Sequence, residues 1–385
     1  MRDADVVNLN TNANVAIVGY GLARFNRDEA SKYSLYELAL QSVVDMFSNM
    51  EYDVRSLKDG IDALITSTTY SSAYTASILA DMLGIRARIV NRVESMCSSG
   101  ADALIAAYSY IASGLSNLAL VVGFDSSNSG MLLDWDVARG DMRHPAHWAA
   151  LYAKKHMQEF GTSREHLAMV AVKNRRGALT NEKAYFYDKG AVNVDDVLSS
   201  KPVVEPLRLY DCSIACNGAA SILLASADIA KSVCREPVWI KGIGSSSIGA
   251  SINSIDLTTM HVTVDAARQA YEMSNVRPEM VDVAQVHDSF TILEILAYED
   301  LGFVEKGKGG YAVEGKIGIP AVNTDGGVLG RGHSSGATGI AQVVEVTRQL
   351  MHKAGSRQIK DCRIGLVHNM AVAGTHASVI VLIRG

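Results

Sequence analysis

Two short turns that share one pattern carry residue types suited to acyl transfer. Cys97 is followed by Ser-Ser-Gly, and so is His333, and apolar residues at helical spacing follow each turn. At the start of a helix, unpaired backbone N–H groups and the positive end of the dipole lower the pKa of a thiol and can hold an oxyanion. We therefore expect Cys97 to be partly thiolate near neutral pH and to attack a thioester carbonyl. The alternative is that Cys97 is only a small buried hydrophobic residue.

Two histidines are the first candidates to move a proton beside that cysteine. Imidazole exchanges protons near neutral pH, and the glycines around His333 permit a close approach of the chain. His287 comes with Asp288 and Ser289 at the end of an apolar run, where ligand sites of α/β proteins gather. The alternative for this segment is a helix cap made by Asp288 or Ser289.

The last apolar runs of the chain carry two more histidines. His368 and Asn369 follow a strand-like run and are a further candidate for the site. His376 lies inside the final alternating run, and we expect it to be structural.

The chain reads as two halves with one order of elements. Apolar runs rich in Val and Ile alternate with segments of helical period, which is typical of α/β layers. The matched segments begin at Val15 and Val238, Ile61 and Val281, Cys97 and His333, and Leu120 and Gly365. We therefore expect an internal duplication with halves 1–237 and 238–385. The polar segment at about 132–206 has no counterpart in the second half and is predicted to be an insertion.

Composition narrows the class of protein. A chain of 385 residues can bury a core of ordinary size. Its net charge of -5 provides no general attraction for nucleic acid or acidic membranes, so we expect neither as a partner. No apolar run approaches the roughly 18 residues that span a bilayer, and residues 1–15 lack the apolar core of a signal peptide. Five scattered cysteines indicate free thiols, so we expect a cytoplasmic protein.

Several motifs in the same order resemble the thiolase superfamily, and within it the sterol-carrier-protein-type and archaeal thiolases. The resemblance extends from about Val15 to Ile383. Its motifs are "CSSG" at Cys97, "GFDS" at Gly123, the segment around "KNRRG", "CSIACNGAAS" from Cys212, "HDSF" from His287, "NTDGGVLGRGHSSGATG" from Asn323 and "HNMAVAG" from His368. It implies an α/β thiolase fold, with two βαβαβαββ halves in a five-layered αβαβα core and an inserted loop domain.

The resemblance also implies roles for the candidate residues. Cys97 matches the nucleophile that accepts the acyl group, and His333 matches the histidine that activates it. His287 matches the histidine of the family's HDCF loop, which supports an oxyanion hole. The turn expected to supply backbone N–H groups to a second hole includes Asn369, Ala371 and Gly374. The implied activity is that of an acetyl-CoA C-acetyltransferase or acyltransferase, with a coenzyme A thioester as substrate and no permanently bound cofactor.

The sequence departs from the family pattern at several positions. Ser289 replaces the HDCF cysteine that moves the α-proton, and a serine hydroxyl is a much weaker base. Positioned bases contribute about 10²–10⁴-fold, so carbon–carbon bond chemistry is expected to be slowed. Ala371 and Ala373 replace glycines of the last turn and are expected to narrow the site. Cys212 and Cys216 lack a second cysteine pair, so we expect no metal site.

Coenzyme A is a polyanion, and the resemblance implies that it lies at the inserted segment, so cations are expected there. The candidates there are Lys173, Arg175 and Arg176, with Lys183 and Lys189 nearby, and Ser246 is a further candidate contact. The alternative for the cations is a solvated helix end.

The resemblance implies a homodimer or tetramer. Because of Ser289, two other functions stay open. One is an aldolase-type subunit that works with a small zinc-ribbon and OB-fold partner, and the other is a non-catalytic scaffold.

Overall fold

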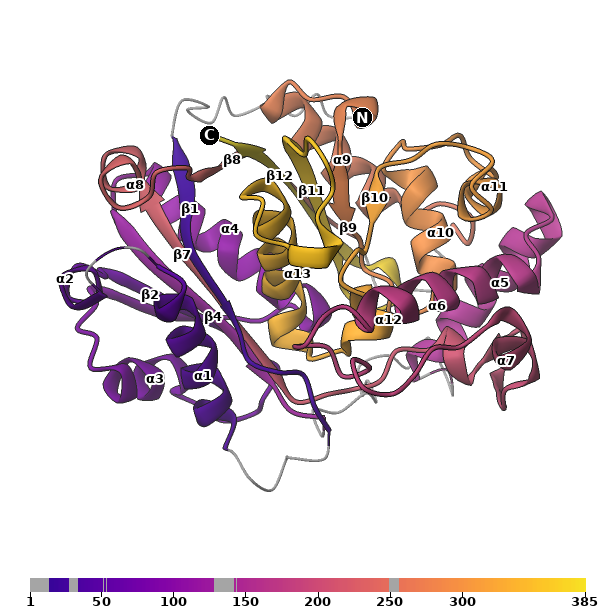
Figure 1. Cartoon of the computed structure of the whole chain (residues 1–385), viewed down its shortest axis with the longest axis horizontal. Coiled ribbons are helices and arrows are strands. Elements are labelled where there is room, and N and C mark those ends of the chain that lie inside the picture. Colours follow the sequence, from indigo (N-terminus) through magenta and orange to yellow (C-terminus); the bar gives the residue numbers. More distant parts are fainter. Residues whose placement is uncertain are drawn as a thin grey trace.

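A computed structural model describes residues 14–27, 34–50, 52, 54–127, 142, 144–248 and 256–385. Residues 1–13, which we examined for a signal peptide, lie outside the described residues. The same is true of 132–141 and 143, the first part of the predicted insertion. Figure 1 shows the chain as a layered arrangement of helices around strands.

Ten strands form one hydrogen-bonded sheet in which each half of the chain contributes five neighbouring strands. The first half runs β1-β7-β4-β2-β3, and the second runs β8-β12-β11-β9-β10. The first set has the bounds Val15–Leu22 (β1), Ala63–Ser67 (β2), Ile89–Val93 (β3), Leu118–Asp125 (β4) and Gly218–Ser226 (β7). The second set has the bounds Val238–Ser247 (β8), Val283–Gln285 (β9), Ala321–Val322 (β10), Ile364–Met370 (β11) and His376–Arg384 (β12).

The two sets have the same internal order and the same strand directions. In each, the first and last strands of the half join antiparallel, and the middle strands join parallel. The sets meet through three antiparallel residue pairs, from Val15 with Ile240 to Ile17 with Val238. The duplicated α/β architecture predicted from the sequence is therefore confirmed.

Helices complete five layers. On the outer face of the first set lie α1 (Leu35–Ser48), α2 (Val54–Asp59), α3 (Thr75–Leu83) and α8 (Ala227–Val233). On the outer face of the second set lie α9 (His261–Ser274) and α10 (Thr291–Asp300). Two helices, α4 (Ser99–Ala112) and α13 (Ser335–Leu350), contact each other and strands of both sets, so they form the middle layer.

The inserted segment packs beside this core. Its elements are α5 (Pro145–Phe160), α6 (Arg164–Ala178), α7 (Val194–Ser199) and the short strands β5 (Pro202–Val204) and β6 (Leu207–Arg208). It contacts α10, α11 (Gly309–Val313) and α12 (Gly327–Arg331) of the second half. The insertion is thus placed against the segment that precedes His333. Among the described residues, no helix has the length and apolar character to cross a membrane.

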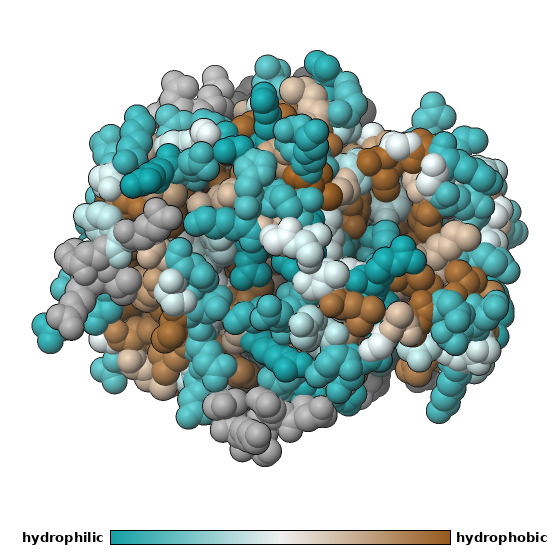
Figure 2. All heavy atoms as spheres, in the orientation of Figure 1, coloured by the Kyte–Doolittle hydropathy of each residue, from teal (hydrophilic) through white to brown (hydrophobic). Residues whose placement is uncertain are grey.

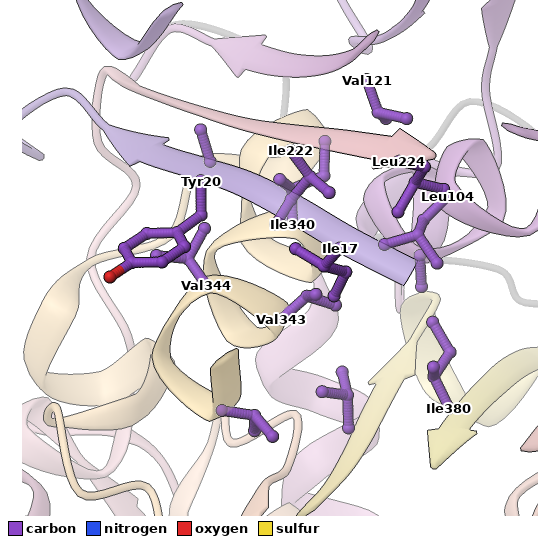
Figure 3. Packing of buried hydrophobic residues seen from close by; sticks show 14 of the residues in the cluster. Ile17, Tyr20, Leu104, Val121, Ile222, Leu224, Ile340, Val343, Val344 and Ile380 are labelled. Carbon is purple, nitrogen blue, oxygen red and sulfur yellow. The ribbon is translucent and has the colours of Figure 1, made fainter. Parts of the chain in front are cut away.

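α13 is buried on nearly every side, whereas α4 buries one face and leaves the other partly exposed. Figure 3 shows Ile340 and Val343 of α13 packed against Ile17 of β1, with Leu104 of α4 beside them. On the face shown in Figure 2, hydrophilic side chains predominate and apolar side chains are exposed in several groups. Exposed apolar residues of α1 and α3 include Val44, Ile78 and Met82.

Glycines allow α4 and α13 to approach at their first turns. A Cβ atom at Gly100 would lie 2.8 Å from the Ile340 nitrogen and 3.0 Å from the Gly336 oxygen. A Cβ at Gly339 would lie 2.5 Å from the Ala101 nitrogen. No side chain fits at either contact, so these residues set how closely Cys97 and His333 can meet.

Replacing Gly100 by Ala is expected to lower the free energy of unfolding by about 1–3 kcal/mol, because backbone of α13 occupies the space of the added methyl group. Thermal and urea unfolding followed by circular dichroism measure the change. Gly318→Ala is the control, because a Cβ there meets nothing within 4 Å. The control should change stability by less than about 0.5 kcal/mol. Equal stability of the two variants would contradict the close contact of α4 with α13.

Candidate active site

Cys97 is placed by a strained turn between β3 and α4. It lies in a short 3-10 helix, η1 (Met96–Ser98), which ends directly before α4 begins at Ser99. Met96 has a φ of 55°, in the left-handed region that residues with a side chain rarely adopt. Its N–H donates to Glu94 Oε1 over 2.7 Å, which helps to hold the turn. The turn directs the Cys97 side chain toward the start of α13.

His333 reaches Cys97 with its proton-accepting nitrogen. Its Nε2 lies 3.1 Å from Cys97 Sγ, and its Nδ1 lies 2.8 Å from Thr338 Oγ1. The Thr338 hydroxyl donates its one hydrogen to the Ser334 carbonyl over 2.9 Å, so it accepts from His333 Nδ1–H. Nε2 therefore carries a lone pair directed at the thiol. This is the geometry of a general base.

His287 lies beside this pair, in the loop between β9 and α10. Its ring centroid is 5.4 Å from that of His333, in an edge-to-face arrangement. Its Nδ1 lies 3.1 Å from Asn369 Nδ2, which can only donate, so Nδ1 accepts and Nε2 bears the hydrogen. His287 is thus prepared to donate to an oxygen that develops negative charge.

Burial makes the resting pair neutral, which corrects one expectation. We predicted a Cys97 pKa low enough for partial ionisation near neutral pH. In the structure, burial raises the pKa of Cys97 to about 11, although the Ser335 hydroxyl near Sγ lowers it. Burial and the charge of Arg331 lower the pKa of His333 to about 4. Burial therefore raises the pKa of Cys97 by more than the start of the helix lowers it. The thiol must then pass its proton to His333 during the reaction.

A small cavity of about 40 Å³ lies against Cys97, His287 and His333. Ser289, Ala371 and Ala373, which sequence analysis singled out, also line it. Apolar and aromatic residues that sequence reasoning missed close most of the wall, namely Trp148, Tyr152, Phe290, Leu293 and Met370. In the sequence, only a position shortly after His144-Pro145 of the insertion, or close to a motif residue, could have indicated them.

The turn predicted to supply a second oxyanion hole uses two of its N–H groups internally. Ala371 N–H donates to the His376 carbonyl over 2.9 Å, and Gly374 N–H donates to the Ala371 carbonyl over 3.2 Å. Ala373 has a φ of 59°, and its carbonyl accepts from the Tyr152 hydroxyl over 2.9 Å. In this arrangement neither predicted N–H is directed at an acyl oxygen. Asn369 contributes through its contact with His287 instead.

Two buried carboxylates hold the loops of the site, and sequence reasoning gave neither this role. Asp125 accepts from Gly336 N–H over 2.7 Å and so ties the start of α13 to β4. Asp288 accepts from the Val328 and Leu329 N–H groups over 2.6 and 3.1 Å, which joins the His287 loop to α12. Burial and the nearby Glu294 raise the pKa of Asp288 to about 7. In the sequence, the "GFDS" and "HDSF" motifs, which contain Asp125 and Asp288, were the signals that could have indicated this role.

Comparisons with known proteins identify the family. The sequence model described as "Thiolase, N-terminal domain" matches residues 15–228, and "Thiolase C-terminal domain-like" matches 244–384. The chain belongs to the thiolase family. The resemblance noted in the sequence is thereby confirmed.

Two relatives and one solved structure illustrate the range of this family. An acetyl-CoA acetyltransferase of Methanothermobacter thermautotrophicus is 38% identical over 81% of this chain and 84% of its own. The benzoylsuccinyl-CoA thiolase subunit BbsB of Thauera aromatica is 30% identical over 92% of this chain and 94% of its own. The structure titled "Ltp2-ChsH2(DUF35) aldolase" matches with a TM-score of 0.84 and 24% identity, over 96% of this chain and 98% of that one. At that identity the structural match shows the fold alone.

The residues predicted to bind coenzyme A do not gather at one place in this thiolase-family chain. A second cavity of about 410 Å³ shares Ser213 with the small one and is lined by Arg175, whose guanidinium lies 3.5 Å above the Phe186 ring. Lys173 and Arg176 line a different hollow. Lys173 forms a 2.9 Å ion pair with buried Glu294, so its charge is already compensated.

Most of the remaining candidate residues lie outside both cavities. Ser246 is on β8 opposite Ala377 of β12 and lines neither the small nor the second cavity. His368 points away from the site and its Nε2 lies 3.0 Å from Thr263 Oγ1. The Nε2 atom of His376 lies 2.9 Å from Asp102 Oδ2. Cys212 lines the second cavity, whereas Cys216 is buried, and neither forms a disulfide.

The pKa of Cys97 predicts how its alkylation depends on pH. Because the thiolate reacts and the pKa is about 11, the rate with iodoacetamide should rise about tenfold per pH unit between about pH 7 and 10. Mass spectrometry of the Cys97 peptide at timed intervals measures this rate, with Cys97→Ser as the blank. A rate that does not change over this range would show a preformed thiolate and imidazolium instead.

Proposed function

We propose that this protein transfers acyl groups from coenzyme A thioesters through an acyl thioester on Cys97, as an acetyl-CoA C-acetyltransferase or related acyltransferase. The observation that carries the proposal is the 3.1 Å contact of Cys97 Sγ with His333 Nε2, whose lone pair is fixed by Thr338. The 38% identity to an acetyl-CoA acetyltransferase supports it.

Acylation uses the three neighbouring groups in turn. His333 Nε2 takes the proton of Cys97, and Sγ attacks the thioester carbonyl carbon. The carbonyl oxygen becomes negative and receives a hydrogen bond from His287 Nε2–H. When the tetrahedral intermediate collapses, the carbon–sulfur bond to coenzyme A breaks, and the departing thiolate takes the proton from His333.

The cavity favours a short acyl group. Its volume of about 40 Å³ exceeds the roughly 10–15 Å³ that one water needs, so about three non-hydrogen atoms fit beside Sγ. An acetyl group has that size. The adjoining cavity with Arg175 is the proposed path for the pantetheine arm and a place for anionic groups of coenzyme A.

The second half of a thiolase reaction needs a base at the substrate α-carbon. Ser289 lines the cavity where the family pattern has cysteine, and its hydroxyl does not ionise near neutral pH. We therefore propose that acylation of Cys97 is faster than carbon–carbon bond formation or cleavage.

A second candidate function is that of an aldolase-type subunit. It is favoured by Ser289 and by the structural neighbour, an aldolase in which Ltp2 is paired with ChsH2(DUF35). In that case a small zinc-ribbon and OB-fold protein is the proposed partner. A non-catalytic scaffold is less favoured, because the thiol and its base lie in contact. A cytoplasmic location and a homodimer or tetramer stay predictions.

Incubation with acetyl-CoA is expected to add one acetyl group to Cys97, located by intact mass and peptide mapping. Cys97→Ala should remove the adduct, because the accepting sulfur is gone. His333→Asn should slow its formation by about 10²–10⁴-fold, the usual contribution of a positioned base. Cys234→Ala is the matched control and should label normally. Acetyl label on another residue, or none at all, would reject the mechanism.

Changing Ser289 to Cys separates the two candidate functions. If the protein is a thiolase with a weakened α-proton step, thiolysis of acetoacetyl-CoA should rise by about 10²–10⁴-fold, because a thiolate replaces the hydroxyl. Release of acetyl-CoA measures the rate, and Ser213→Cys, at another position of the cavity wall, is the control. An unchanged rate with normal acetylation of Cys97 would favour the aldolase-type reaction.

A further inference from the structure

The geometry points to a second ligand of the site. We propose that Cys97, His287 and His333 bind one zinc ion, and that this ion reversibly blocks acyl transfer. One thiol or imidazole atom from each residue lies within 4.8 Å of the others, and among the described residues no other such group was found. The proposal does not depend on the identity of the acyl substrate, because zinc binding can be measured without it.

His333 is already arranged as a zinc ligand. Zinc-binding histidines present one nitrogen to the metal and donate the other N–H to an oxygen that fixes the ring. His333 Nδ1–H donates to Thr338 Oγ1 over 2.8 Å, and Nε2 lies 3.1 Å from Cys97 Sγ. Its lone pair and the sulfur therefore face the same point.

An amide rotation of Asn369 would prepare His287 to become the third ligand. Its Nδ1 now accepts from Asn369 Nδ2, so Nε2 holds the hydrogen. Asn369 Oδ1, however, is buried without a hydrogen-bond partner. Turning the amide by 180° would place this oxygen at His287 Nδ1, where it could accept a hydrogen. The proton then resides on Nδ1, Nε2 gains a lone pair toward the site, and the orphaned oxygen gains a partner.

The space around the three atoms fits a tetrahedral ion. Zinc bonds of about 2.3 Å to sulfur and 2.0–2.1 Å to nitrogen put ligand atoms about 3.3–3.6 Å apart. The Sγ–Nε2 distance of 3.1 Å is close to this value, and small side-chain rotations within the 4.8 Å group bring in His287. The cavity of about 40 Å³ leaves room for a water as the fourth ligand.

Binding changes the chemistry of the site in one balanced step. The Cys97 S–H bond breaks, a bond from sulfur to zinc forms, and one proton leaves to solvent. The sulfur and the His333 lone pair are then both occupied. Acylation is consequently blocked until zinc dissociates.

The test uses the full-length protein freed of metal by chelation and dialysis, with Co²⁺ and Zn²⁺ as probes and no acyl-CoA present. One equivalent of Co²⁺ should produce a sulfur-to-cobalt absorption band and the visible bands of tetrahedral cobalt, and Zn²⁺ should abolish both. Calorimetry gives the affinity and stoichiometry. One equivalent of Zn²⁺ should also protect Cys97 from iodoacetamide, and excess chelator should restore its alkylation.

Variants separate this site from adventitious binding. Cys97→Ala should remove the sulfur-to-cobalt band, whereas Cys212→Ala, in the neighbouring cavity, should leave it unchanged. Thr338→Val keeps the side-chain shape but loses the hydrogen bond to His333, so it should weaken Zn²⁺ binding by about 10–100-fold. Unaltered Zn²⁺ affinity in Cys97→Ala, or loss of the band in Cys212→Ala, would overturn the proposal. Acetylation of Cys97 in metal-free protein is scored separately and tests only the proposed function.

Discussion

The close contact of two helix starts is the constraint on which the site depends. Cys97 and His333 are separated by most of the chain, yet their reacting atoms lie 3.1 Å apart because α4 and α13 meet at their first turns. Gly100 and Gly339 leave no room for a side chain there. Asp125 secures the second helix start to a strand of the first half. The duplication thus supplies two equivalent positions, and the glycines bring them within reach.

Exclusion of water then decides the protonation states. A thiol and an imidazole in an enclosed pocket are each more stable uncharged, and burial moves their pKa values away from neutrality in opposite directions. The thiolate is therefore expected to form when a polar substrate or a metal ion compensates its charge. The hydrogen bond that His333 donates to Thr338 and the one that His287 accepts from Asn369 fix which ring nitrogen faces the thiol and which faces an acyl oxygen. The site therefore activates Cys97 by orienting the two imidazoles through hydrogen bonds, and not by lowering the pKa of the thiol.

Periodicity and motif spacing predicted the architecture well, because apolar runs and glycine turns are local signals. The convergence of Cys97 and His333 followed from placing matched turns at equivalent positions of two halves, whereas His287 was predicted from its place at the end of an apolar run and from the family resemblance. What failed depended mainly on contacts between distant segments. The ion pair of Lys173 with Glu294 and the desolvation of Cys97 arise from neighbours far away in sequence. The Ala371 N–H is used within its own turn, by the His376 carbonyl, which depends on the exact path of the backbone there. Thr338, five residues beyond His333, lies within the quoted "HSSGATG" stretch, but its role was missed because a hydroxyl inside a helix does not by itself indicate a hydrogen bond to the histidine.

The distribution of the reacting groups along the chain has a consequence for biosynthesis. The thiol belongs to the first half and both imidazoles to the second, and the two halves meet through a short run of paired strand residues, their middle helices and the contacts of the insertion. While a ribosome is still making the second half, the emerging polypeptide holds a cysteine without its base. Cys97 therefore gains its base only after the second half has been made and has folded against the first. Until then, the growing chain is not activated for acylation.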